Sequence, residues 1–161
     1  MIFNMLSEYD RLLPFHTTIG TRSKMIKIKH NVNGVAIDEK RIIVSYYEPF
    51  YNSEAKTFCF NAGIQPLNNI VAYNHDGDLI WDIKDIMVKD VSLPKIEDTD
   101  DIYSNIEIFN KEKLPYASLR DFDINLLLDD RNYLFCCGNS GRRYVIDLET
   151  LEVLYKKGFR F

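Results

Sequence analysis

The chain contains little glycine, proline, histidine or cysteine: 7, 5, 3 and 3 residues among 161. With 46% hydrophobic and 27% charged residues, its composition is that of a globular domain long enough to bury its own core. The cysteines are odd in number. Cys136 and Cys137 are adjacent, so on a strand they would point to opposite faces and bridge poorly. We therefore expect structural thiols in a reducing, cytoplasmic environment.

Long apolar runs are also absent. No stretch approaches the ~20 consecutive apolar residues that a membrane-spanning helix needs. The N-terminal sequence MIFNMLSEYDRLLP has no basic region ahead of an apolar one, and it already contains Glu8 and Asp10. This is not the pattern of a signal peptide. The sequence thus predicts neither a membrane span nor a secretion signal.

The chain also lacks an excess of basic residues. The chain has 24 acidic and 20 basic residues, a formal net charge of −4 and a pI near 5.4. Direct binding to nucleic acid usually needs a basic face, so this balance argues against it. An acidic chain would suit a basic protein partner.

What the chain does have is aromatic residues and alternating patterns. Ten Tyr and ten Phe favour strands. In MIKIKH, Ile26 and Ile28 alternate with lysines, as in a strand buried on one face. Apolar residues at roughly helical spacing before Pro14 predict a short N-terminal helix, Phe3 to Leu13. Further strands are expected at GVAID, RIIVSYY, TFCFNAG, NIVAYN, DLIWDI, NIEIF, INLLLDD, NYLFCCG, RYVIDL and EVLYKK.

Two parts of this strand pattern recur. VAIDEKRIIVSY (Val35–Tyr46) aligns without gaps on LLLDDRNYLFCC (Leu126–Cys137), at an offset of 91 residues. VAYNHDGDLIW (Val71–Trp81) aligns on VIDLETLEVLY (Val145–Tyr155), at an offset of 74 residues. Each copy reads strand, Asp-led turn, strand, connection, strand, turn, strand. The sequence therefore predicts two related β units.

The stretch NHDGDLIW poses a choice between a calcium loop and a turn. Asn74, Asp76 and Asp78 carry oxygen atoms at alternate positions around Gly77. An EF-hand would also need a distal Glu and flanking helices, and the matching segment 148–152 lacks the pattern. Asp-Gly between two strands is a strong hairpin signal, because Gly accepts the positive φ of the turn. We interpret the stretch as a hairpin and expect no tight metal binding.

The sequences NIVAYNHDGDLIWDI and RRYVIDLETLEVLYK resemble blades of quinoprotein-type and related β-propellers. In those blades a strand, an Asp/Gly turn and a strand ending in Trp recur. The resemblance covers Val35–Trp81 and Leu126–Tyr155. It implies two blade-like antiparallel units, whereas a closed propeller needs at least ~4 blades. The two units would form a sandwich, a bent sheet or an open barrel. Alternatively, the chain is one subunit of a propeller-like oligomer.

We expect one mainly β domain over residues 1–161. Its parts would be an N-terminal segment (1–34), a first β repeat (35–93), a linker (94–118) and a second β repeat (119–161). The first repeat carries an insertion, 47–63, that the second lacks, and part of it is predicted to be an added strand at Thr57–Asn61. Long insertions on a rigid scaffold are where function tends to lie.

Ligand-binding motifs are scarce. His16, His30 and His75 share no local spacing with a carboxylate or cysteine that would indicate a zinc site. The segment CCGNSGRR (Cys136–Arg143) could form an anion nest, but it lacks the ending of a P-loop and falls where the repeat places a turn. We therefore expect no catalytic, cofactor or metal site.

A hydrolase assembled from distant residues is the alternative. It would use a histidine together with Asp121, Asp123 or Asp129. No sequence motif marks this alternative. A nucleophile and its base are identified by their geometry and not by their spacing in the sequence.

A non-catalytic binding protein is the favoured function. Small, acidic, single-domain chains without catalytic motifs resemble in kind the immunity proteins of bacterial toxin–immunity pairs. Those proteins block toxins that are often nucleases. The expected partner contacts are aromatic anchors and charges in the insertion, together with an acidic run in KIEDTDDIYSNIEIF. They are Tyr47, Glu48, Phe50, Tyr51, Glu54, Glu97, Asp98, Asp100, Asp101 and Tyr103. In a competing interpretation, the aromatic residues of the insertion fold back and cap a sheet.

Overall fold

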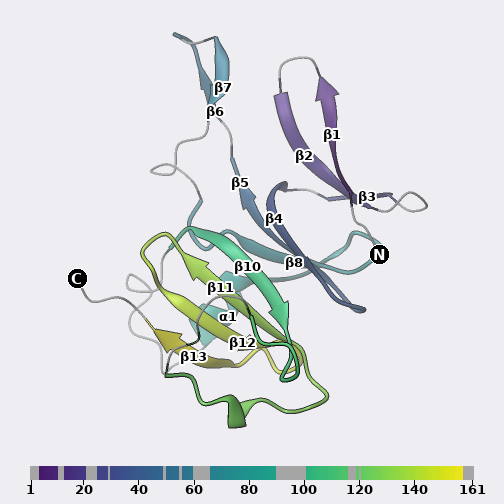
Figure 1. Cartoon of the computed structure of the whole chain (residues 1–161). Coiled ribbons are helices and arrows are strands. Elements are labelled where there is room, and N and C mark those ends of the chain that lie inside the picture. Colours follow the sequence, from purple (N-terminus) through teal and green to yellow (C-terminus); the bar gives the residue numbers. More distant parts are fainter. Residues whose placement is uncertain are drawn as a thin grey trace.

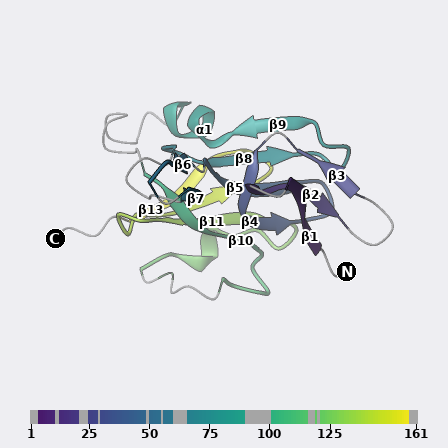
Figure 2. The same cartoon turned by 90° about the horizontal axis from the view of Figure 1, so that it is seen from above.

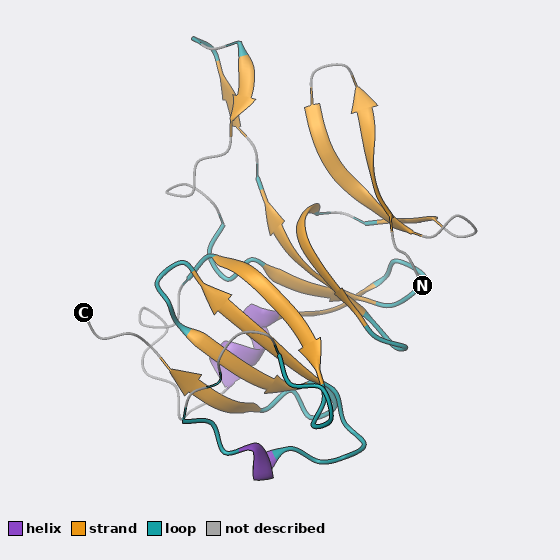
Figure 3. Ribbon diagram, viewed as in Figure 1, coloured by secondary structure: helices purple, strands orange, loops and turns teal. Residues whose placement is uncertain are grey.

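A computed structural model shows a mainly β protein built from two antiparallel four-stranded sheets, as the sequence predicted (Figures 1 and 3). The sheets pack face to face as an open sandwich. No helix in the part of the chain that the structure describes is long and apolar enough to cross a membrane. The described residues are 4–10, 13–20, 25–28, 30–48, 50–54, 56–59, 66–89, 101–115, 119 and 121–157.

Both large sheets are meanders, in which each strand pairs with the next one along the sheet. The first sheet has the order β4-β5-β8-β9 and the second the order β10-β11-β12-β13. Their bounds are β4 Asn31–Ile37, β5 Ile42–Tyr47, β8 Ile70–Tyr73, β9 Leu79–Asp82, β10 Tyr103–Phe109, β11 Tyr133–Gly138, β12 Arg143–Asp147 and β13 Val153–Lys157.

Smaller elements flank the sandwich. They are β1 Asn4–Asp10, β2 Leu13–Gly20 and β3 Met25–Lys27 in a three-stranded sheet, the pair β6 Phe50–Asn52 and β7 Thr57–Cys59, the helix α1 Ile83–Lys89 and the 3-10 helix η2 Ile124–Leu126.

The expected N-terminal helix is wrong, because β1 pairs with β2. Inter-strand pairing satisfies the backbone groups that a helix would have satisfied internally. The described helix instead begins at Ile83, where the Asp82 carboxylate accepts a hydrogen bond from the Lys84 N–H.

Three of the four strands of each sheet fall at the offsets of the sequence alignment. β11 lies 91 residues after β5, and β12 and β13 lie 74 residues after the matching parts of β8 and β9. The first strand does not follow the alignment. Leu126 belongs to η2, and the second sheet takes its first strand from β10, inside the range expected as a linker. The connection 110–132, called the 110–132 loop below, therefore stands where the first sheet has the short turn 38–41; its described residues are 110–115, 119 and 121–132.

The central strands are buried on both faces, which explains their almost continuous apolar sequences. Between the sheets, Ile43 and Ala72 meet Leu134 and Ile146. The outer face of the first sheet packs on Ile26 and Ile28, while the outer face of the second packs against the 110–132 loop. The predicted alternation of Ile26 and Ile28 toward a core is thus confirmed.

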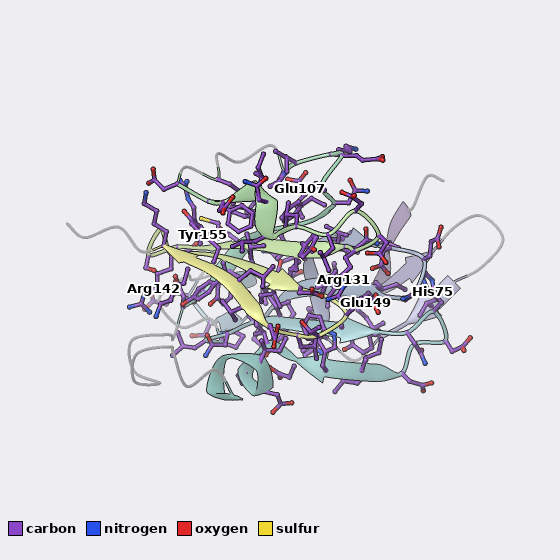
Figure 4. The ribbon with its side chains drawn as sticks, turned by 90° about the horizontal axis from the view of Figure 1, so that it is seen from below. His75, Glu107, Arg131, Arg142, Glu149 and Tyr155 are labelled. Carbon is purple, nitrogen blue, oxygen red and sulfur yellow. The ribbon has the colours of Figure 1, made fainter. Side chains whose placement is uncertain are left out.

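One end of the sandwich is held by Arg41, which is only 6% exposed. Its guanidinium donates to the Leu148 carbonyl oxygen and pairs with Glu149 at 2.9 Å. Its Nε lies 3.1 Å from the Asp38 carboxylate. Arg41 therefore joins the β4–β5 turn of the first sheet to the β12–β13 turn of the second. Figure 4 shows Glu149 and Arg131 at this end and Arg142 away from it.

The other end is held by Asn69, which is 2% exposed. Its amide nitrogen donates to the carbonyls of Tyr46 (2.7 Å) and Tyr103 (3.1 Å), and its amide oxygen accepts from the Tyr103 N–H (2.6 Å). The preceding Asn68 N–H donates to the Asp101 carbonyl at 2.6 Å. One side chain thus completes the backbone pairing at the end of β5 and at the start of β10.

We predict that Asn69→Ala lowers the free energy of unfolding by about 2–4 kcal/mol, because it leaves three buried backbone groups without partners. Urea unfolding followed by fluorescence measures this loss. Asn125→Ala is the control, since the Asn125 amide is exposed and bonds only locally to Asp123; its effect should stay within about 0.5 kcal/mol. Equal stability of the two variants would remove Asn69 from this role.

Candidate functional site

The insertion after β5 forms a hairpin. β6 pairs antiparallel with β7, from Phe50↔Cys59 to Asn52↔Thr57. The predicted added strand is confirmed for Thr57–Cys59, and the remainder of that prediction, 60–61, lies outside the described residues. In Figure 1 the hairpin stands clear of both large sheets. The described part of the insertion, β6 and β7, therefore extends from the sandwich.

The predicted contact residues of the insertion lie along this hairpin and at its base. Tyr47, at the end of β5, is half-buried, and burial raises the pKa of its hydroxyl. Glu48 and Glu54 are exposed, and Phe50 and Tyr51 are the first two residues of β6. This half of the predicted set thus lies within one short stretch of the chain, from the end of β5 to the turn between β6 and β7.

The acidic half of the predicted set does not form one exposed surface. Glu97, Asp98 and Asp100 lie outside the described residues. Asp101 is 5% exposed and Tyr103 is fully buried, so neither side chain is accessible to a partner in this structure. We therefore leave Asp101 and Tyr103 out of any contact surface.

Asp101 has a structural role instead. Its carboxylate accepts hydrogen bonds from the Ser140 hydroxyl and from the Ser140 and Ile102 N–H groups, at 3.2 and 2.8 Å for the last two. A Cβ on Gly138 would lie 2.0 Å from the same carboxylate. Asp101 thus fastens the β11–β12 turn to the strand that begins at Tyr103, and only glycine leaves room for it.

Tyr103 fills the space between the sheets. Its ring meets that of Tyr144 edge to face, with centroids 6.1 Å apart. Burial raises the pKa of the Tyr103 hydroxyl, with smaller contributions from Cys136 and Tyr144. Neither tyrosine hydroxyl has a hydrogen-bond partner of normal geometry among the described residues. Both rings therefore act as core side chains.

The carboxylates and histidines of the alternative hydrolase lie on different parts of the fold. Asp121 and Asp129 belong to the 110–132 loop, where they pair with Lys157 and Lys111. His75 binds the Asp38 carbonyl at 2.9 Å. Among the described residues, these contacts join none of the carboxylates to a histidine, which is the geometry that general acid–base catalysis would use.

His30 lies against the outer face of the first sheet. Its Nδ1 shares a hydrogen bond with the Tyr73 hydroxyl, and its ring stacks on Tyr46 with centroids 4.3 Å apart. Burial raises the pKa of Tyr46 to about 12, with further contributions from Asp82 and Glu48. His30 therefore belongs to a packed aromatic group over that sheet. His16 falls in β2.

The segment Cys136–Arg143 is the end of β11, a turn and the start of β12, as the repeat predicted. The Gly138 N–H donates to the Arg142 carbonyl, so the turn is closed by its own backbone. Cys136 faces the central core and Cys137 the outer one, which confirms their opposite directions. Burial raises the pKa of the Cys136 thiol, which disfavours the reactive thiolate.

The Asn74–Asp78 stretch forms the predicted hairpin turn between β8 and β9. The Asn74 side-chain oxygen accepts from the Asp76 and Asp78 N–H groups, both at 2.9 Å, and Gly77 has a φ of 93°. The matching Leu151 of the second sheet has a φ of 59°. The two hairpins therefore share a backbone shape, although their side chains differ.

Three exposed aliphatic residues lie on a loop that sequence reasoning missed. Ile124, Leu126 and Leu128 are 48, 52 and 49% exposed. The stretch INLLLDD was interpreted as a strand because of its apolar run. Its signal was the sequence DFDINLLLDD, in which four aspartates and no basic residue flank the aliphatic residues.

We predict that Asp76 and Asp78 bind neither calcium nor zinc tightly, because the Asn74 oxygen that would ligate a metal already accepts two backbone hydrogen bonds. The described residues contain no group of three or more potential metal ligands. Titration calorimetry should show no dissociation constant in the micromolar range. Micromolar binding that disappears in Asp76→Ala would contradict this prediction.

Comparison of the chain with protein families, with curated proteins and with solved structures finds no match. Its function is therefore argued from its own residues and their arrangement.

Proposed function

We propose that this protein is a non-catalytic binding protein that neutralises a basic protein toxin by direct contact. A nuclease is the preferred candidate for that toxin. Immunity proteins of bacterial toxin–immunity pairs work in this manner. The observation that carries the proposal is the β6–β7 hairpin, an aromatic-rich element that stands clear of the sandwich (Figure 1).

A hairpin of this kind gains little stability from its own two strands. A two-stranded hairpin without a sheet or helix to pack on is only marginally stable in water. Its sequence nevertheless places Phe50 and Tyr51 in β6 and Phe58 in β7. Aromatic residues of this kind are the commonest anchors of protein interfaces. A partner that contacts the hairpin would meet these aromatic residues.

The charges near the hairpin suit a basic partner. Glu48 and Glu54 are both exposed, and Lys56 is the one basic residue of the segment 47–59. The whole chain carries a net charge of −4. Opposite charges on two partners raise their association rate at low ionic strength. We therefore expect capture of the partner to be more efficient at low than at high salt.

Affinity purification from the native host at low salt tests the proposal. We expect recovery of a small basic protein whose toxic activity, assayed first as nuclease activity, is inhibited by the purified chain. Gel filtration of the complex separates this function from the oligomer alternative, which requires a ring-sized particle of the chain alone. Recovery of no protein, together with turnover in a substrate screen, would favour an enzyme instead.

We predict that Phe50→Ala combined with Tyr51→Ala abolishes capture of the partner while changing the melting temperature little. The reason is that the backbone of the β6–β7 hairpin stands clear of both large sheets in Figure 1. Leu67→Ala is the control, since Leu67 is a 47% exposed apolar residue outside the hairpin. If the double variant melts several degrees lower and still captures the partner, the aromatic residues belong to the fold and not to an interface.

A further inference from the structure

The 110–132 loop is held in one shape by residues that point toward the second sheet. Leu127 is 1% exposed and packs with Tyr133 and Phe109. Phe122 meets Tyr155 edge to face, with centroids 5.4 Å apart. The Leu128 N–H donates to the Tyr133 hydroxyl at 2.8 Å. The loop thus closes the outer face of the sheet.

Polar contacts fix the rest of the loop. The Asp123 carboxylate accepts from the Asn125 N–H at 3.0 Å and so caps η2. The ion pair Lys111–Asp129, at 2.8 Å, joins the two limbs of the loop. Lys157 of β13 pairs with Asp121. These contacts therefore order the described segment 121–130 before any partner arrives, which lowers the entropic cost of binding.

The same contacts turn three aliphatic side chains outward. Leu127 points inward while its neighbours Leu126 and Leu128 are about half exposed, and Ile124 is exposed to the same degree. Leu114, on the other limb of the loop, is 44% exposed. Contiguous apolar residues that a monomer keeps exposed commonly mark interaction sites.

Carboxylates flank these aliphatic residues. Asp121 and Asp123 precede them and Asp129 and Asp130 follow, and the segment 121–130 contains no basic residue. Asp129 is 86% exposed at its side chain. Asp130 forms no ion pair within the described part of the chain. An apolar centre with a charged rim is the usual arrangement of a protein interface.

We infer that the loop segment 121–130 is a contact surface for a basic protein segment in which apolar side chains lie beside Lys or Arg. A second copy of the chain would place like charges opposite each other, and an anionic membrane surface would repel the same carboxylates. The charge pattern therefore selects a basic protein. This surface is separate from the β6–β7 hairpin: the loop lies at the lower end in Figure 1, and the hairpin lies at the upper end.

A defined peptide tests the surface without knowledge of the natural partner. The probe is a fluorescein-labelled peptide of alternating Leu and Lys, and its control has Ser in place of every Leu. Binding is measured by fluorescence anisotropy at low and at physiological salt. We expect the Leu–Lys peptide to bind more tightly than the Ser–Lys peptide, because the apolar centre adds to the charge attraction.

The test variant is Leu126→Ala with Leu128→Ala. The matched control is Leu79→Ala with Ile80→Ala, which removes two apolar side chains that are 57 and 49% exposed on β9. Figure 2 shows β9 on the side of the molecule away from the loop. We expect the loop variant to weaken binding of the Leu–Lys peptide at least about tenfold, the effect of losing interface anchors, and the control variant to bind as the parent does.

A second variant, Asp129→Asn with Asp130→Asn, tests the charges and should flatten the salt dependence of binding. Urea unfolding should show that all three variants retain the parent stability. The inference is overturned if the loop variant loses no more affinity than the β9 control, or if the Ser–Lys peptide binds equally well. Neither result depends on capture of a partner from the host, so failure here and failure of the proposed function are distinguishable.

Discussion

The structure depends on how two sheets that share no strand are held at their ends. The Asn69 amide makes the hydrogen bonds of a short β-bridge to Tyr103, and the Asn68 N–H adds a bond to Asp101. At the opposite end, Arg41 binds the β12–β13 turn. Buried polar groups are costly unless satisfied, so these contacts select one relative placement of the sheets. An apolar interface alone would permit sliding.

Because the contacts of Asn69 and Arg41 fix the two ends of the sandwich, the connections between strands can differ between the two sheets. Each sheet is a four-stranded meander, but the first carries its long insertion between β5 and β8 and the second between β10 and β11. In a meander, successive connections alternate between the two ends of the sheet. The β6–β7 hairpin and the 110–132 loop consequently emerge at opposite ends of the molecule, as Figure 1 shows.

Sequence patterns predicted the strands best where burial is regular. Ile42–Tyr47 and Tyr133–Gly138 are almost wholly apolar because they are buried on both faces, and the repeat was visible there. Leu126–Leu128 imitated a strand, yet only Leu127 turns inward. The sequence predicted Asp101 as part of an acidic surface. The prediction failed because the partner of Asp101, Ser140, lies 39 residues away in the sequence. Local sequence patterns carry no information on such long-range contacts. These contacts override the intrinsic strand propensity of a segment.

The loop also shows how an exposed apolar surface is kept without loss of order. Leu127 anchors the segment in the outer core, and the adjacent Asp123 and Asp129 are each engaged in a local contact. Exposed Leu126 and Leu128 therefore need not collapse onto the sheet, because their backbone is already fixed on both sides. The carboxylates that flank them also oppose self-association, since two copies would bring like charges together. The fixed backbone and the flanking carboxylates together explain how exposed aliphatic residues coexist with an ordered segment.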